Sequence, residues 1–146
     1  MEQDTQYQKA YDKALRLISM RSHSVFELKN KLTSKGYGKE LLDKLINDLI
    51  DKKYLDDESF ASNYLDNLIK YKAFGFYGLK AKLMQRGIDK GLIDSLLGNL
   101  SLADEKKIAL KFLGKKKEVD PIKLARSLGS KGFRSEVIGE ILRNQS

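Results

Sequence analysis

The large aliphatic residues of this chain recur with a helical period, and the same pattern occurs three times. Within each copy they occupy positions i, i+1, i+4 and i+5, which lie on one face of an α-helix, whereas a half-buried strand would alternate apolar and polar residues. Three amphipathic helices, each with one buried face, are therefore predicted. Their apolar positions are Leu41, Leu42, Leu45, Ile46 and Leu49; Leu92, Ile93, Leu96, Leu97 and Leu100; and Val137, Ile138, Ile141 and Leu142.

A second predicted helix precedes each of these segments and ends in a cation followed by a glycine. Glycine at this place predicts a left-handed residue just beyond the helix, and the cation favours the negative end of the helix dipole. Aligned on the glycines, the copies lie 51 and 45 residues apart, a period typical of stacked helical repeats. The three endings are Lys35-Gly36, Arg86-Gly87 and Lys131-Gly132.

The starts of these second helices are also marked in the sequence. Ser24, Gly75 and Asp120 each precede one of them and can act as its N-cap. Ser24 with Glu27, three residues later, predicts a capping box. The residue after Asp120 is proline, which suits the first position of a helix.

The expected fold is all-α, an elongated array of three tandem three-helix repeats with about nine helices. A single repeat of about 45 residues is close to the size below which a chain rarely folds alone, so neighbouring repeats are expected to stabilise one another. First helices are expected over residues 8–20, 57–73 and 103–115. The repeats are expected to span residues 1–55, 56–100 and 101–146.

The composition restricts the chemistry open to the chain, which has 146 residues, no cysteine and one histidine, His23. The lack of thiols excludes a disulfide framework and thiol catalysis, and one histidine cannot supply a nitrogen or sulfur metal site. We expect no metal, no cofactor and an exposed His23 in a connecting segment. No apolar run approaches the roughly 20 residues that cross a bilayer, and the polar N-terminus lacks a signal-peptide pattern. A cytoplasmic monomer without membrane contact is expected.

The acidic residues Asp56, Asp57 and Glu58 form the one tight cluster of carboxylates, where a divalent cation or acid–base chemistry is conceivable. Capping is favoured, because the three residues precede a predicted helix start. Carboxylates at that place accept backbone N–H groups and complement the helix dipole. The sequence contains no nucleophile elbow, phosphate-binding glycine loop or kinase motif. Nothing in it argues for an enzyme.

The net charge of +8 is uneven, since residues 1–55 contribute +3, residues 56–100 are neutral and residues 101–146 contribute +5. Much of the positive charge falls on the second helices, at equivalent positions in the first two repeats, while the third repeat lacks the flanking lysines. Stacking would align these cations into an interrupted row. We call these cations the basic stripe and expect them to bind a filament or DNA. A solvated helix face that compensates helix C-termini is the alternative interpretation. The stripe consists of Lys29, Lys31, Lys35, Lys80, Lys82, Arg86, Arg126 and Lys131.

The third helices are expected to expose carboxylates, among them Asp43, Asp48 and Glu136. Such side chains would face phosphates if these helices entered a DNA groove, so helix-turn-helix recognition is disfavoured. Two further features are undecided between a structural role and a contact role. They are the lysine run Lys115, Lys116 and Lys117, and the aromatic group Tyr71, Phe74, Phe76 and Tyr77 with Lys70 and Lys72.

Several short motifs follow one another along the chain: Ala14-Leu15, Ser24 with Glu27-Leu28, Lys35-Gly36-Tyr37, Leu55-Asp56-Asp57-Glu58-Ser59-Phe60-Ala61 and Arg86-Gly87-Ile88. In this order they resemble the RecX family, bacterial regulators of RecA. The resemblance covers nearly the whole chain and is strongest over residues 14–97. It implies an all-helical array of three-helix repeats without a catalytic motif. The family-motif residues, which are expected to be structural, are Leu55, Asp56, Asp57, Phe60, Ala61, Gly36, Gly87 and Gly132.

The RecX resemblance also implies a function, namely a regulator that binds the RecA nucleoprotein filament in its helical groove. Such a protein modulates, mostly by inhibition, the ATPase and strand-exchange activities of RecA in recombination and the SOS response. A filament offers the same surface at regular intervals, so repeats can make equivalent weak contacts that combine through effective concentration. The alternative, based on the net charge, is a basic protein that acts directly on single- or double-stranded DNA.

Overall fold

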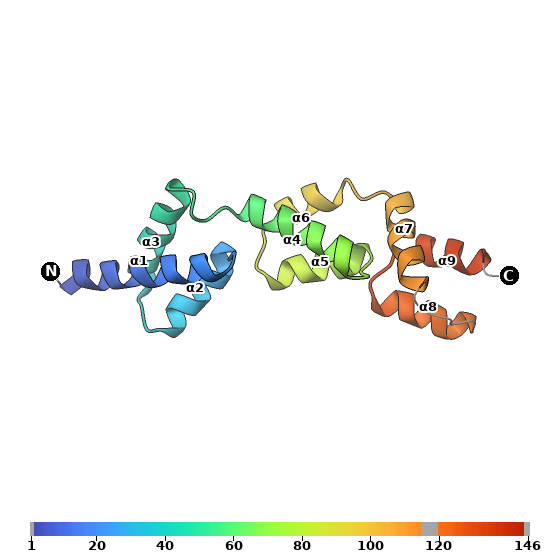
Figure 1. The fold of residues 1–146 in the computed structure, drawn as a ribbon, viewed down its shortest axis with the longest axis horizontal. Coiled ribbons are helices and arrows are strands. Elements are labelled where there is room, and N and C mark those ends of the chain that lie inside the picture. Colours follow the sequence, from blue (N-terminus) through green and yellow to red (C-terminus); the bar gives the residue numbers. More distant parts are fainter. Residues whose placement is uncertain (1, 115–119, 145–146) are drawn as a thin grey trace. The chain divides into compact units, whose positions relative to one another are not determined.

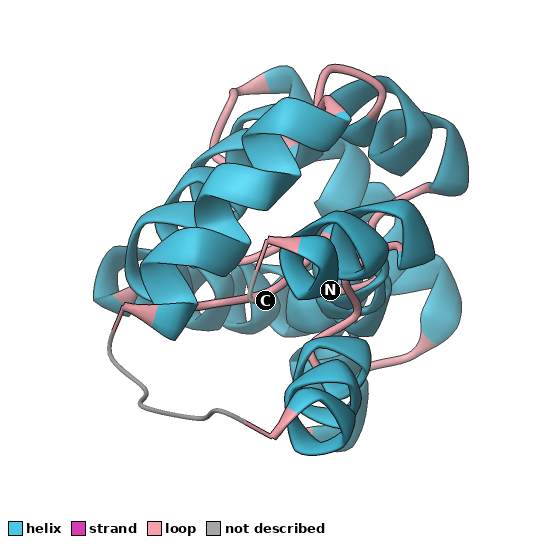
Figure 2. Cartoon of the chain, turned by 90° about the vertical axis from the view of Figure 1, so that its right-hand side faces the viewer, coloured by secondary structure: helices cyan, strands magenta, loops and turns pink. Residues whose placement is uncertain are grey.

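The computed structural model describes residues 2–114 and 120–144, with side chains from residue 4 onward. Within these ranges it contains nine α-helices and no strand (Figures 1 and 2), which confirms the all-α prediction. None of the described helices is both long and apolar enough to cross a membrane. The helices are α1 (Glu2–Met20), α2 (Val25–Ser34), α3 (Lys39–Asp51), α4 (Asp57–Tyr71), α5 (Phe76–Gln85), α6 (Lys90–Leu97), α7 (Leu102–Leu113), α8 (Pro121–Ser130) and α9 (Ser135–Arg143).

The first helix is longer than the sequence pattern predicted, because α1 starts at Glu2 and not at residue 8. A contact with another helix explains the extension. The Tyr7 hydroxyl donates to Asp48 on α3, and the Lys44 ammonium lies 5.0 Å from the centre of the Tyr7 ring. Packing against α3 thus holds a polar segment in helical form, which a periodicity of apolar residues cannot reveal.

The predicted caps at Ser24 and Asp120 and the predicted left-handed glycines are confirmed. Ser24 and Glu27 form the capping box, with the Glu27 N–H and the Ser24 hydroxyl oxygen 3.2 Å apart. The Asp120 carboxylate accepts from the Ile122 N–H at 2.9 Å, and the intervening proline begins α8. All three repeat glycines are left-handed, with φ of 95° at Gly36, 74° at Gly87 and 80° at Gly132.

The contacts of the chain form two compact units. The N-terminal unit comprises Met1–Ala61 with Arg86–Ile88, and in it α1 packs against both α2 and α3 (Figure 1). Ala10 and Ala14 let α1 approach closely, while Leu45 and Leu49 on α3 are completely buried beneath it. The predicted apolar stripe of the first repeat is therefore its core.

The C-terminal unit comprises Ser62–Gln85 with Asp89–Ser146. Its helix α9 packs against α7 and α8, and α5 packs against α6. The α9 stripe is buried through Val137 and Ile141, each 1% exposed, in a cluster with Leu124 and Leu128 from α8. The second leucine-rich helix, α5, buries Leu79 and Leu83 completely, as its sequence predicted.

Candidate partner-binding surface and the joints of the fold

The basic stripe in the N-terminal unit is largely engaged within the protein. The Lys29 ammonium lies 2.9 Å from the Asp43 carboxylate on α3. The Arg86 guanidinium lies 2.7 Å from the Glu27 carboxylate, which Arg21 also contacts at 3.2 Å. Burial alone would raise the pKa of Glu27, but hydrogen bonds from the Ser24 N–H and the two guanidinium groups lower it overall. Lys29 and Arg86 therefore have structural roles in addition to any contact role.

Lys31 on α2 and Lys35, the residue that follows α2, differ in exposure. Lys31 points its ammonium at a ring nitrogen of His23, 2.8 Å away. Lys35 is exposed, and its backbone N–H closes the end of α2 by donating to the Leu32 carbonyl. Of these two cations, Lys35 is the one displayed to solvent.

The stripe residues of the C-terminal unit also divide into cations that contact other side chains and cations that are exposed. The Lys82 and Lys131 ammonium groups each lie 5.2 Å from the centre of the Phe74 ring, and Lys131 is also 5.8 Å from Phe112. Lys80 is half-buried, and Arg126 is exposed on α8. Cations held over aromatic faces contribute to packing, so Arg126 is the stripe residue most open to a partner in this unit.

The aromatic group of the sequence analysis divides between core and surface. Phe74 and Phe76 are partly buried, and the Arg134 guanidinium stacks 4.6 Å from the Phe76 ring. Tyr71 and Tyr77 are 75% and 58% exposed. The lysine run at residues 115–117 lies outside the described residues.

A joint in the N-terminal unit connects the start of α2 to the glycine turn at Gly87. The Ser24 hydroxyl donates to the Arg86 carbonyl at 2.6 Å, so this residue both caps α2 and holds the turn. A Cβ atom on Gly87 would lie 2.2 Å from the Phe26 side chain, which rests where that atom would be. The Val25 N–H donates to the Asp57 carboxylate at 2.8 Å.

The Asp57 contact corrects part of the capping prediction. Asp56 does cap the start of α4, accepting from the Ser59 N–H at 3.2 Å and the Ser59 hydroxyl at 3.0 Å. Asp57 instead accepts a hydrogen bond from the first N–H of α2, because the backbone of Val25 lies close to it in the fold. Burial raises the pKa of Asp57, an effect that the Val25 hydrogen bond opposes. The two carboxylates therefore serve different helices, and no cluster of potential metal ligands occurs among the described residues.

A second joint, within the C-terminal unit, uses the corresponding positions. The Gly75 N–H donates to the Lys131 carbonyl at 2.9 Å, and the Phe76 N–H donates to the Glu105 carboxylate at 3.0 Å. A Cβ atom on Gly132 would lie 2.0 Å from the backbone nitrogen of Gly78. Counted from the repeat glycines, Gly75 corresponds to Ser24.

The two joints are built in the same way. In each, a glycine turn contacts the start of a second helix, and a carboxylate on a first helix accepts a hydrogen bond from the first N–H of that second helix. Such N–H groups lack a partner within their own helix. Gly36 is different, since a Cβ atom there would meet nothing within 4 Å. Gly87 and Gly132 thus have a packing role that Gly36 lacks, although the sequence gives all three the same turn.

Glu105 and Arg134 are central to the second joint, and sequence reasoning did not identify them. Glu105 is completely buried, 2.5 Å from Arg134 Nε, and also accepts the Arg134 N–H at 2.8 Å. Arg134 further donates to the Leu100 carbonyl at 3.1 Å. One signal was available, because Glu105 is three and four residues before Ile108 and Ala109 and so belongs to the apolar face of α7. A charge on such a face indicates a buried partner.

The expectation of an exposed His23 was wrong, because the ring is only 4% exposed. Its Nδ1 lies 2.9 Å from the Arg21 carbonyl and its Nε2 lies 2.8 Å from the Lys31 ammonium. An ammonium can only donate, so Nε2 is the unprotonated acceptor and Nδ1–H donates to the carbonyl. Burial lowers the pKa of His23 and the Lys31 charge adds to this, while the Arg21 carbonyl opposes it.

The neutral His23 predicts a loss of stability in mild acid. The unfolded chain takes up a proton near the ordinary histidine pKa of about 6.5, while the folded chain resists it, so stability is complete above that pH and falls below it. At about pH 5.5 this one group can account for at most about 1.4 kcal/mol. Urea unfolding at about pH 7.5 and 5.5 measures the loss. His23→Gln should reduce the difference between the two pH values; an unchanged difference would exclude His23 as its source.

Several known proteins resemble this chain in sequence and in fold. Residues 10–49 match the model of the first three-helix domain of RecX. The chain is 34% identical to regulatory protein RecX of Chlorobium limicola over 88% of this chain and 84% of that protein. It is also 34% identical to the regulatory protein RecX of Chlorobium phaeobacteroides, over 95% of each chain. The crystal structure of RecX from Lactobacillus salivarius has the same fold, with a TM-score of 0.84 at 22% identity over 95% of this chain and 96% of that one.

Proposed function

This chain belongs to the RecX family, and from that membership we propose that it binds the RecA nucleoprotein filament and modulates, mostly by inhibition, its ATPase and strand-exchange activities. The observation that supports this most is the likeness to regulatory proteins across 95% of the chain. On this proposal the protein is a cytoplasmic, monomeric, non-enzymatic regulator of recombination and the SOS response.

The repeated construction gives the proposal a physical basis. A filament displays one surface many times, and a ligand with equivalent modules over residues 1–55, 56–100 and 101–146 can engage several copies together. Each contact can then be weak, because the first contact raises the effective concentration for the next. Exposed cations on or beside the second helices, such as Lys35 and Arg126, suit a target that contains DNA.

A binding measurement distinguishes this function from direct action on DNA. Labelled protein is titrated with preassembled RecA filaments on single-stranded DNA, and separately with the same DNA alone. Filament binding predicts much tighter association with the filament. The alternative, a basic protein that binds DNA directly, is favoured by the net charge of +8. It predicts tight binding to DNA alone, with an affinity that falls linearly on a log–log salt plot, by about 0.7 in slope per phosphate neutralised on a single strand.

The contribution of the stripe can be tested without disturbing the fold. Lys35→Glu combined with Arg126→Glu reverses two exposed charges and is expected to weaken filament binding about tenfold, because a favourable charge contact becomes a repulsive one. The matched control reverses Lys39 and Lys90, exposed lysines at the starts of third helices. Equal affinities of the two double variants would remove the stripe from the binding surface. Arg86 and Lys31 are unsuitable, since they contact Glu27 and His23.

A further inference from the structure

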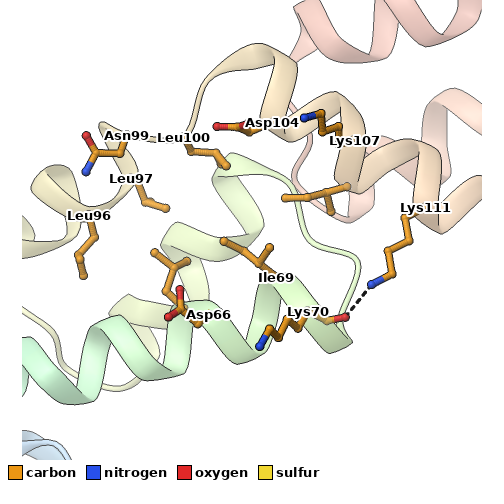
Figure 3. Close-up of a pocket in the computed structure, with 12 residues that line it drawn as sticks. Asp66, Ile69, Lys70, Leu96, Leu97, Asn99, Leu100, Asp104, Lys107 and Lys111 are labelled. Carbon is orange, nitrogen blue, oxygen red and sulfur yellow. Dashed lines mark hydrogen bonds between the residues drawn. The ribbon is translucent and has the colours of Figure 1, made fainter.

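An apolar groove lies in the C-terminal unit between α4, α6 and α7 (Figure 3). Its volume is about 520 Å³, within the range of about 300–1,000 Å³ that binding sites commonly have. A smaller hollow of about 110 Å³ shares Ile69, Lys70, Ile108 and Lys111 with it. The floor of the groove consists of Leu65, Ile69, Leu96, Leu97, Leu100 and Ile108.

The repeat alignment shows that one apolar position of α6 is less covered than its counterparts. Leu96 on α6 corresponds to Leu45 on α3 and Ile141 on α9, counted from the repeat glycines. Leu45 is 0% exposed and Ile141 1% exposed, whereas Leu96 is only partly buried. In the other two cases a first helix covers the stripe, since α1 packs on α3 and α7 packs on α9. At Leu96 the apolar face of α6 is therefore less covered than at the corresponding positions of α3 and α9, while α4 lines the same groove through Leu65 and Ile69.

The charges around the groove indicate the chemistry of its occupant. Lys70, Lys107 and Lys111 surround it together with Asp66 and Asp104. Asp104 belongs to the capping box of α7, where its carboxylate faces the Ser101 N–H. The adjoining hollow adds Lys72, beside the largely exposed ring of Tyr71. The cations thus outnumber the carboxylates, and one group of each sign, Lys111 and Asp104, is already engaged within the protein.

Lys111 connects two of the helices that line the groove. Its ammonium donates to the Lys70 carbonyl at 3.0 Å and so ties α7 to the last turn of α4 (Figure 3). Lys70 and Lys107 are exposed at the edge, and each can reach a carboxylate on a ligand. Lysines of this kind add selectivity for an acidic ligand above an apolar floor.

We propose that this groove docks an amphipathic helix of a partner protein, with an apolar face against the floor and acidic residues beside it. Helices commonly bind in this way, through residues at i, i+3 or i+4, and i+7. The assignment goes beyond RecA modulation and does not depend on it, because it follows from the apolar groove beside Leu96 and the surrounding lysines.

The test uses the full-length chain and a pair of synthetic helical peptides of about 18 residues, long enough to hold helical structure. Both carry leucines at i, i+3 or i+4, and i+7; one has glutamate at the flanking positions and the other lysine. Binding is followed by backbone NMR shifts. The glutamate peptide should bind, with shifts centred on Ile69, Leu96 and Leu100, and at least tenfold more tightly than the lysine peptide.

A charge reversal completes the test. Lys70→Glu with Lys107→Glu is expected to weaken binding of the glutamate peptide about tenfold. The control, Lys90→Glu with Lys123→Glu, reverses two exposed lysines away from the groove and should bind as the unaltered chain does. Circular dichroism shows that both variants keep their helicity. No binding at about millimolar peptide, equal binding of the two peptides, or shifts centred elsewhere would each overturn the proposal.

Discussion

Replacing Gly132 with alanine is expected to destabilise the protein by about 4 kcal/mol, far more than the same change at Gly36. Both glycines are left-handed, so each substitution costs about 1–2 kcal/mol for the backbone conformation alone. At Gly132 the new Cβ atom would also lie 2.0 Å from the nitrogen and 2.6 Å from the Cα of Gly78. Relieving that overlap separates the joint and weakens the hydrogen bonds that Gly75 and Tyr77 donate across it.

Gly36→Ala is the matched control, because the space around Gly36 is open. Gly87→Ala should also cost more than Gly36→Ala, since its new Cβ atom would lie 2.2 Å from the Cβ of Phe26, which rotation of the Phe26 side chain does not move. Urea unfolding followed by helical circular dichroism gives the three free energies of unfolding. Equal losses at the three glycines would show that the joints contribute nothing beyond the turns themselves.

Glu105→Ala is expected to cost about 3–5 kcal/mol, the usual loss when one partner of a buried ion pair is removed. The substitution leaves the Arg134 guanidinium without its carboxylate and leaves the N–H groups of Phe76 and Arg134 without their acceptor. Water cannot readily replace that acceptor, because Glu105 is completely buried. The loss should therefore greatly exceed that of an exposed pair.

Two comparisons separate the contributions at this site. Glu105→Gln keeps an oxygen for the two N–H groups but removes the charge, and should cost less than alanine. Glu140→Gln, which removes the charge from a partly exposed carboxylate 2.7 Å from Lys106, should change the free energy of unfolding little. Thermal or urea unfolding of the three variants measures these differences. A Glu105→Ala protein as stable as Glu140→Gln would show that the joint does not depend on the carboxylate.

Local chemistry was sufficient to predict much of the fold. The apolar stripes became α3, α6 and α9, except that Leu100 lies beyond the end of α6 at Leu97. The caps at Ser24 and Asp120 formed because the residues that make them are close in sequence. The left-handed glycines followed from the same short-range rules. These features depend on a few neighbouring residues, so a sequence contains nearly all the information needed.

The features that were missed depend on residues from different helices. His23 is buried by its contact with Lys31, and Asp57 faces Val25 from a distant part of the chain. The stripe was placed at equivalent positions, yet position alone could not show that Lys29 would meet Asp43 or that Lys131 would lie over Phe74. The incomplete burial of Leu96 is likewise invisible in sequence, since the corresponding Leu45 and Ile141 are buried.

The central claim is that this protein restrains RecA by binding the nucleoprotein filament. It is tested most directly by the rate at which RecA hydrolyses ATP on single-stranded DNA as purified protein is added. The rate is expected to fall with increasing protein and to approach a low limit at several-fold excess. An unchanged rate at that excess, with the added protein shown to be folded by circular dichroism, would contradict the claim.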